Sequence, residues 1–188
     1  DDPYNDIGII SIDQWGNNQW KTMEGAFYGQ KSLVINTNQT PDLSQCTNMD
    51  EVFYYNKNLH LSSSNSWNAW NTSTITTMKA AFAKTNFNEP IENWDVSNVT
   101  NMNSLFLENE SFNQPLNAWD VGNVTDMSSM FMRAINFNQP LNNWDVSKVI
   151  YMTRMFFIAK VFNQPLNNWD VSKVTKMNLM FDTAQNFN

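Results

Sequence analysis

The 188-residue sequence is poor in the residue types from which small catalytic and metal sites are usually built. One cysteine, Cys46, excludes an internal disulfide, and one histidine, His60, excludes a zinc site made of several histidines. No Ser-His-Asp or Cys-His pair can be assembled around them, and with five glycines there is no glycine-rich phosphate loop. We therefore predict that the protein is not an enzyme and carries no organic cofactor.

Basic residues are also in deficit. Eleven Lys and Arg stand against 18 Asp and Glu, which gives a net charge of −7 and an isoelectric point near 4.5. An acidic chain repels nucleic acid and anionic membrane surfaces, whereas a cationic partner or calcium is allowed. No apolar run is long enough to cross a bilayer and no signal peptide is present, so we expect no membrane insertion by this segment.

What the sequence has in abundance is repetition. The dipeptide Phe-Asn recurs at intervals of 25 residues, beginning at Phe87, Phe112, Phe137, Phe162 and Phe187. A Trp column, a Met eight residues later and a Phe four residues after that define seven repeats, with Pro41 in the Trp place of the second. Such a period is typical of stacked units that cannot bury their apolar faces alone. We predict one domain over residues 1–188, with a lead-in at 1–11, irregular repeats at 12–84 and regular repeats at 85–188.

Within a repeat the apolar spacing changes. Trp119 and Val121 are two residues apart, as in a strand, whereas Val124, Met127 and Phe131 are three and four apart, as on a helix. Hydroxyl side chains stand where the caps of such helices would lie, at Thr100, Thr125 and Thr175. The lead-in isoleucines Ile7, Ile9 and Ile10 indicate a first strand. We therefore predict an α/β repeat fold, a right-handed leucine-rich-repeat-like solenoid of about seven turns with one parallel sheet and short helices.

The runs FNQPLNAWDVGNVTDMSSMF at 112–131 and FNQPLNNWDVSKVTKMNLMF at 162–181 resemble the BspA-type leucine-rich-repeat surface proteins of mycoplasmas and other bacteria. The resemblance is close over residues 85–188 and loose over 12–84. It implies a secreted or surface-anchored bacterial protein, and some relatives act in adhesion. The family itself is classed as of unknown function.

Two columns of side chains stand out as a candidate core and a candidate site. The tryptophans, Trp70, Trp94, Trp119, Trp144 and Trp169, are expected to pack in the core, with a sugar-stacking platform as the weaker alternative. The aspartates that follow them are expected to point to the solvated face, at Asp95, Asp120, Asp145 and Asp170. Each aspartate can cap its own turn through the Ser or Gly two residues later, or the column can hold a weak calcium ion or bind a basic partner.

Asparagines and the aromatic residues of a longer repeat complete the expected surface. Asn143 and Asn168 lie beside the aspartates and are expected to form ladders of stacked amides. The irregular stretch from residue 54 to 70 offers Tyr54, Tyr55 and Trp67, which either recognise a partner or fill a bulged repeat. The sequence does not separate these two alternatives.

For function, we expect a non-catalytic module at the cell surface, extracellular and bacterial, that recognises a protein or glycan through the Asp/Asn face. A structural stalk in a larger surface protein is the alternative, and ice binding by the Thr column a weaker third. One edge changes from neutral or acidic to basic along the repeats, which favours recognition: Asn98, Asn123, Lys148 and Lys173, then Asn101, Asp126, Tyr151 and Lys176. The sequence ends as a further repeat opens, so we also expect a longer natural chain and end-to-end self-association through the C-terminal repeat.

Overall fold

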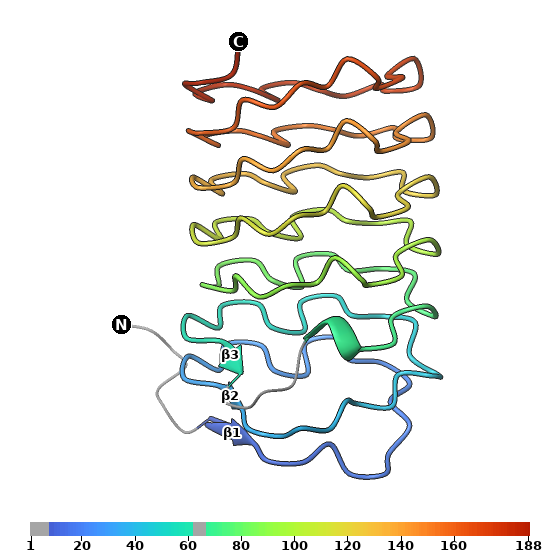
Figure 1. Cartoon of the computed structure of the whole chain (residues 1–188), viewed down its shortest axis with the longest axis vertical. Coiled ribbons are helices and arrows are strands. Elements are labelled where there is room, and N and C mark those ends of the chain that lie inside the picture. The colour runs from blue at the N-terminus through green and yellow to red at the C-terminus, as the bar shows by residue number, and fades with distance from the viewer. Residues whose placement is uncertain (1–7, 62–66) are drawn as a thin grey trace.

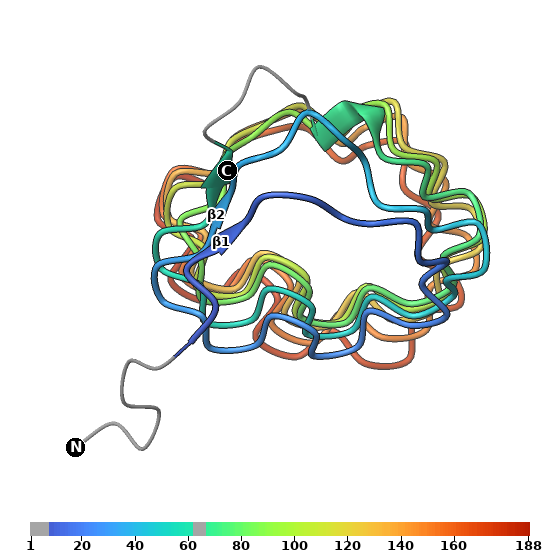
Figure 2. The same ribbon diagram turned by 90° about the horizontal axis from the view of Figure 1, so that it is seen from below.

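The computed structural model describes residues 8–61 and 67–188, and there the backbone runs in closed loops stacked along one axis. Figure 1 shows the loops one above another from the N-terminal to the C-terminal end, and Figure 2 shows them superposed as one elongated ring. We call each loop a rung. Single-residue parallel bridges join successive rungs, at Asn48, Thr77, Asn101, Asp126, Tyr151 and Lys176. The 25-residue period is therefore the length of one rung in the regular half of the chain.

Regular secondary structure is scarce. Three two-residue strands, β1 (Ser11–Ile12), β2 (Val34–Ile35) and β3 (His60–Leu61), pair in parallel in the order β1-β2-β3. Ser11 pairs with Val34, and Val34 with His60. A short 3₁₀ helix, η1, spans Trp67–Ala69. The lead-in strand thus begins at Ser11, after the exposed Ile9 and Ile10, while Ile7 lies outside the described residues.

The predicted fold class is therefore wrong. Residues 8–61 and 67–188 contain no α-helix, and their strands are confined to the N-terminal part, so a leucine-rich-repeat-like solenoid with a continuous sheet and short helices is not what forms. The backbone is mostly irregular and built from turns. Nor do the threonines cap helices, since Thr100 and Thr125 donate their hydroxyls to the carbonyls of Thr76 and Thr100 in the preceding rung.

A run of overlapping turns takes the place of each predicted helix. In residues 127–134, the N–H groups of Met130 and Met132 close turns on the carbonyls of Met127 and Ser129 at 3.2 and 3.1 Å. The alternate N–H groups point along the stack instead: Ser129 donates to Thr153 at 2.8 Å and Phe131 to Met155 at 2.9 Å. An α-helix would satisfy every donor within the segment, so it could not bind the next rung in this way.

These turns require left-handed residues at the same two places in each rung, two and six residues after the Met. Twelve non-glycine residues have φ between 53° and 63°: Glu51, Tyr55, Ala80, Lys84, Ser104, Glu108, Ser129, Arg133, Arg154, Ile158, Leu179 and Thr183. In the first rung the two places are taken by Gly25 and Gly29. Left-handed backbone costs an L-residue about 1–2 kcal/mol, so the stack must offset a recurring strain.

The core is the part of the fold that the sequence predicts correctly. Trp70, Trp94, Trp119 and Trp144 are at most 4% exposed, as core packing requires. The indole N–H of each regular-repeat tryptophan donates to a carbonyl of the preceding rung, from Trp119 to Ile91 and from Trp144 to Leu116, for example, at 3.1 and 2.8 Å. Phenylalanines stack from rung to rung at centroid distances of 5.5–5.9 Å, through Phe82, Phe106, Phe131, Phe156 and Phe181. The rungs therefore share one continuous apolar interior.

Candidate functional site

The aspartate column lies on the surface, as predicted, and each side chain is tied to its own turn. Asp95, Asp120, Asp145 and Asp170 are all exposed. One carboxylate oxygen of each accepts the N–H of the residue two places later at 2.9–3.0 Å, from Ser97, Gly122, Ser147 and Ser172. The structure therefore shows the turn capping, which is compatible with a partner at the same carboxylates. The capping bond uses Oδ1 and leaves the second oxygen of each carboxylate to the surface.

The turn hydrogen bonds also lower the pKa of three of these aspartates, Asp95, Asp145 and Asp170. The Ser97 hydroxyl and N–H lower the pKa of Asp95, and the Ser147 hydroxyl and N–H lower that of Asp145. For Asp170, the N–H of Ser172 is the main cause of the lowered pKa, followed by the Ser172 hydroxyl. Lys148 and Lys173 add to the effect at Asp145, and Lys173 at Asp170. The C-terminal half of the column is thus partly neutralised by lysines.

We expect the protein to lose stability in acid because of these carboxylates. An unfolded aspartate titrates near pH 3.9, and the folded pKa values of Asp95 and Asp145 lie lower. Above about pH 5 both states are ionised and the stabilisation is fully present. As the pH falls through about 4 the unfolded chain binds protons first, and stability drops until the folded carboxyls are protonated. Urea unfolding at pH 7, 5, 4 and 3 should show this decline.

The matched control removes the hydroxyls and keeps the aspartates. Ser97→Ala with Ser147→Ala should flatten the decline below pH 5, because the folded pKa values then move toward the unfolded one. An identical pH profile in the double variant would contradict the assignment.

Gly122 lies between the carboxylates of two aspartates of successive rungs. A Cβ at that residue would lie 3.2 Å from Oδ1 of Asp120 and 3.5 Å from Oδ2 of Asp145. Because Gly122 has no side chain, no Cβ stands between the carboxylates of Asp120 and Asp145 at this turn. Within the described residues, no three His, Cys, Asp or Glu side chains are placed to hold a metal ion together. Calcium at the column would therefore find fewer than three acidic ligands.

The asparagines form ladders, but of a different kind from the stacked amides we predicted. The backbone N–H groups of Asn143 and Asn168 donate to the side-chain oxygens of Asn117 and Asn142 in the preceding rung, both at 3.1 Å. The side chains of Asn143 and Asn168 themselves are exposed beside the aspartates. A second ladder of the same type runs through the Phe-Asn loop, where Asn88, Asn113, Asn138 and Asn163 each accept the N–H of the next rung's asparagine.

Of the two alternatives left open for Trp67, a surface that recognises a partner and the filling of a bulged repeat, the structure shows the second. It is fully buried in η1, with its ring 5.3 Å from Phe53 and 5.0 Å from Phe87, and its carbonyl accepts the indole N–H of Trp94 at 2.7 Å. The longer repeat thus folds inward at this point, and the indole occupies the interior between two rungs. The bulge-filling alternative holds for Trp67.

Tyr54 and Tyr55 are half-buried and belong to a separate column at the end of the turn run. Tyr54 stacks on Tyr28 at 4.9 Å, and the ammonium of Lys84 lies 5.6 Å from the Tyr54 ring. A hydrogen bond to Tyr54 is the main cause of the raised pKa of Lys84. The Tyr54 ring thus packs against Tyr28, and Tyr54 also interacts with Lys84. Because the two tyrosines come five and six residues after Met49, in the turn run, they do not share a column with the aspartates, which directly follow the tryptophans.

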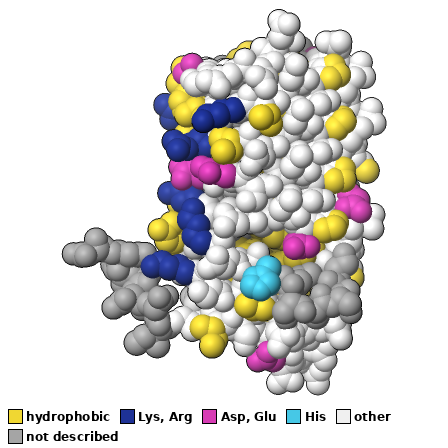
Figure 3. All heavy atoms as spheres, turned by 60° about the vertical axis from the view of Figure 1, so that its left-hand side comes forward, with side chains coloured by type: hydrophobic (Ala, Val, Ile, Leu, Met, Phe, Trp, Pro, Cys, Tyr) yellow, Lys and Arg dark blue, Asp and Glu magenta, His cyan; other side chains and the backbone are white. Residues whose placement is uncertain are grey.

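A surface column that the repeat pattern alone did not indicate continues from these tyrosines. Inter-rung hydrogen bonds place Lys84 beside Leu107, Glu108 beside Met132 and Arg133 beside Phe157. Figure 3 shows basic, acidic and apolar side chains interleaved along one edge of the molecule. The signal that could have revealed the underlying turns is the pair Gly25 and Gly29, two and six residues after Met23, because glycine favours positive φ.

Taken together, the stacked rungs and the periodic polar columns define a repeat protein. The sequence profile of the family described as "Mycoplasma protein of unknown function, DUF285" matches residues 17–122, 60–156 and 115–188. The chain belongs to this family. No curated protein and no solved structure matches it. Within residues 8–61 and 67–188 there is no helix of the length and apolarity needed to cross a membrane.

Proposed function

We propose that this chain is a non-catalytic recognition module of a bacterial cell surface, which binds a protein or glycan through the face that carries Asp95, Asp120, Asp145, Asp170, Asn143 and Asn168. The observation that carries the proposal is the turn bond at each aspartate. It holds a row of exposed carboxylates in one orientation, one per rung, and a preorganised row of charges loses little entropy on binding.

The charges favour a partner that presents amino or guanidinium groups, and they favour the N-terminal half of the column. Lys148 and Lys173 help to lower the pKa of Asp145, and Lys173 helps to lower that of Asp170, whereas no lysine or arginine contributes to the lowered pKa of Asp95. Gly122 also leaves the turn after Asp120 without a side chain. We therefore place the centre of the surface at Asp95 and Asp120.

The test removes two charges and keeps the fold. Asp95→Asn with Asp120→Asn should weaken binding of a fluorescent decalysine peptide at least fivefold at low salt, measured by anisotropy. Asparagine serves the turn equally well, since Asn71 in the same column accepts the N–H of Ser73 at 3.2 Å. The control, Glu110→Gln with Asp182→Asn, removes two exposed charges elsewhere and should leave the affinity within twofold.

Equal losses in both double variants would mean that only net charge matters, and the column assignment would fail. The same experiment on a panel of surface glycans covers the second class of partner.

A stalk that holds another domain away from the surface is the alternative, and one observation favours it. Hydrogen bonds along the turn runs link each described rung to the next, and the two asparagine ladders add further bonds between the regular rungs. Such a structure resists bending whether or not it binds anything. Unchanged binding of every probe by the Asp95→Asn, Asp120→Asn variant would leave this function as the better one.

A further inference from the structure

A stripe of apolar side chains runs along the outside of the stack, over the turn runs. It is formed by the residue five places after the Met in each of five successive rungs: Tyr54, Ala83, Leu107, Met132 and Phe157. Ala83 is fully buried and the other four are half-buried. The interior column directly before it keeps Phe in every rung, whereas this column changes its residue type and remains apolar. We call it the apolar stripe.

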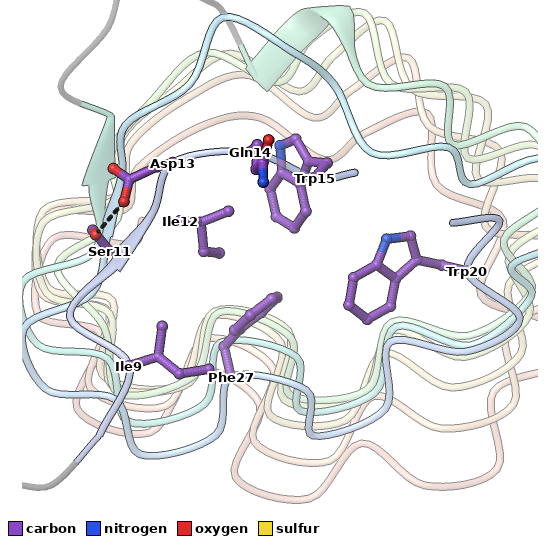
Figure 4. A pocket seen from close by; sticks show the side chains of 8 residues that line it. All are labelled: Ile9, Ser11, Ile12, Asp13, Gln14, Trp15, Trp20 and Phe27. Atoms are coloured by element: carbon purple, nitrogen blue, oxygen red, sulfur yellow. Dashed lines mark hydrogen bonds between the residues drawn. The ribbon is translucent and has the colours of Figure 1, made fainter. Parts of the chain in front are cut away.

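The apolar stripe lies on the flank of the stack and is separate from the interior. Figure 4 shows the Phe27 ring inside the N-terminal rung, together with the rings of Trp15 and Trp20. The next residue, Tyr28, lies outside, and its ring stacks on Tyr54 at 4.9 Å. Most members of the stripe belong to rungs with a neighbour on both sides, so a further repeat at either end would leave them uncovered.

A column of alternating charge borders the stripe. Lys84, Glu108 and Arg133 each directly follow a stripe residue, in three successive rungs. Lys84 is engaged within the chain, because its ammonium lies 5.6 Å from the Tyr54 ring. Arg133 is exposed, and within the described residues the side chains of Glu108 and Arg133 form no hydrogen bond or ion pair. One carboxylate and one guanidinium beside the stripe therefore remain available to a partner.

We propose that two copies of the chain associate side by side through the apolar stripe, in antiparallel orientation. The two-fold axis passes between the rung of Leu107 and the rung of Met132. Such an isologous contact makes each pair twice. Glu108 of each copy faces Arg133 of the other, and Leu107 faces Met132. The contact thus has an apolar centre with charged pairs beside it, as interfaces between proteins commonly have.

The order of the charges selects this register. An axis through the rung of Glu108 would set Glu108 against its own copy and Lys84 against Arg133, and like charges opposite one another are unfavourable. An axis one rung nearer the N-terminus would pair Glu108 with Lys84, which already contacts Tyr54, and would leave Arg133 without a carboxylate. A parallel arrangement centred on the stripe would set the rung of Glu108 against itself, and residues 95–119 contain no Lys or Arg.

The contact leaves the aspartate column free and does not depend on the function proposed above. Glu108 and Arg133 come about half a rung after Asp95 and Asp120. Because each rung is a closed ring, half a rung along the chain leads to its other side (Figure 2). A dimer would therefore present two aspartate faces pointing away from each other.

Sedimentation equilibrium of the chain from micromolar to millimolar concentration tests the association. An isologous contact closes, so the mass should rise to that of a dimer and no further. A chain that stays monomeric at millimolar concentration, or one that grows beyond the dimer, would overturn the proposal.

Exchanging the two charges tests the register. Glu108→Arg alone and Arg133→Glu alone should each weaken dimerisation at least about tenfold, because each sets like charges together at two places. The double variant restores both pairs with the signs exchanged and should dimerise nearly as well as the unmodified chain. A 1:1 mixture of the two single variants should form a heterodimer, since every facing pair is then of opposite sign. Full dimerisation of either single variant, or a mixture that stays monomeric, would overturn the proposal.

Matched controls make the same changes of charge away from the stripe. Glu110→Arg and Lys160→Glu alter exposed side chains and should leave dimerisation within twofold of the unmodified chain. Thermal unfolding should show that all these variants are folded, because none of the substituted side chains belongs to the apolar core. Equal losses in the controls would mean that net charge governs association, and would overturn the proposal.

Discussion

Replacing Phe131 with alanine is expected to lower the free energy of unfolding by about 3–5 kcal/mol. The ring is fully buried and stacks at 5.7 Å on Phe106, 5.6 Å on Phe156 and 4.0 Å on Phe137. Backbone hydrogen bonds fix the spacing between this rung and the rungs above and below it, so the cavity left by the ring cannot collapse easily. Urea unfolding of the variant and of the unmodified chain measures the difference.

The same substitution at the end of the stack is the matched control. Phe181 occupies the identical column and stacks on Phe156 at 5.5 Å and on Phe187 at 4.0 Å, but it is only partly buried and lacks the third stacked ring that Phe131 has. Phe181→Ala should therefore cost much less than Phe131→Ala. Equal losses at the two positions would contradict the continuous apolar interior.

Replacing Ser129 with glycine is expected to stabilise the protein by about 1 kcal/mol. Ser129 has a φ of 57°, which an L-residue adopts at a cost and glycine does not. A change of this sign is unusual, because glycine ordinarily destabilises ordered backbone by about 0.5–1 kcal/mol relative to alanine. For a chain of this length, 1 kcal/mol corresponds to a rise in melting temperature of about 2–4 °C.

Ser128→Gly, one residue earlier, gives the opposite expectation. Ser128 has a negative φ and its N–H is held by Asp126 at 2.8 Å, so glycine there should cost about 0.5–1 kcal/mol. Thermal unfolding of the two variants in parallel measures both signs. A loss of stability in Ser129→Gly would show that the left-handed residue carries no strain.

The failed helix prediction has a specific physical cause. Apolar residues three and four apart, such as Met127, Met130 and Phe131, are buried together on one side, as they would be on a helix. Overlapping turns produce the same spacing while directing alternate N–H groups out of the segment. Local sequence does not distinguish the two, because the acceptors are Tyr151, Thr153 and Met155, about 25 residues away.

Only part of the candidate site could be predicted, because the rest depends on contacts between residues far apart in the sequence. The exposure of Asp95 and Asp120 and their capping by the residue two places on are local properties, and the sequence indicates both. The effect of Lys148 and Lys173 on Asp145 depends on neighbouring parts of the surface. The sequence leaves both a surface role and bulge filling open for Trp67, because its stretch is longer than a repeat, and only the packing of η1 against Phe53 shows that the indole is buried.

The sequence by itself determined the 25-residue period, the columns of buried tryptophan, methionine and phenylalanine, and the exposed aspartates, because each of these depends on which residues recur at equal spacing. The tertiary structure decided the backbone conformation of each rung. Contacts between rungs stabilise left-handed residues such as Ser129 and Arg133, which local preference disfavours.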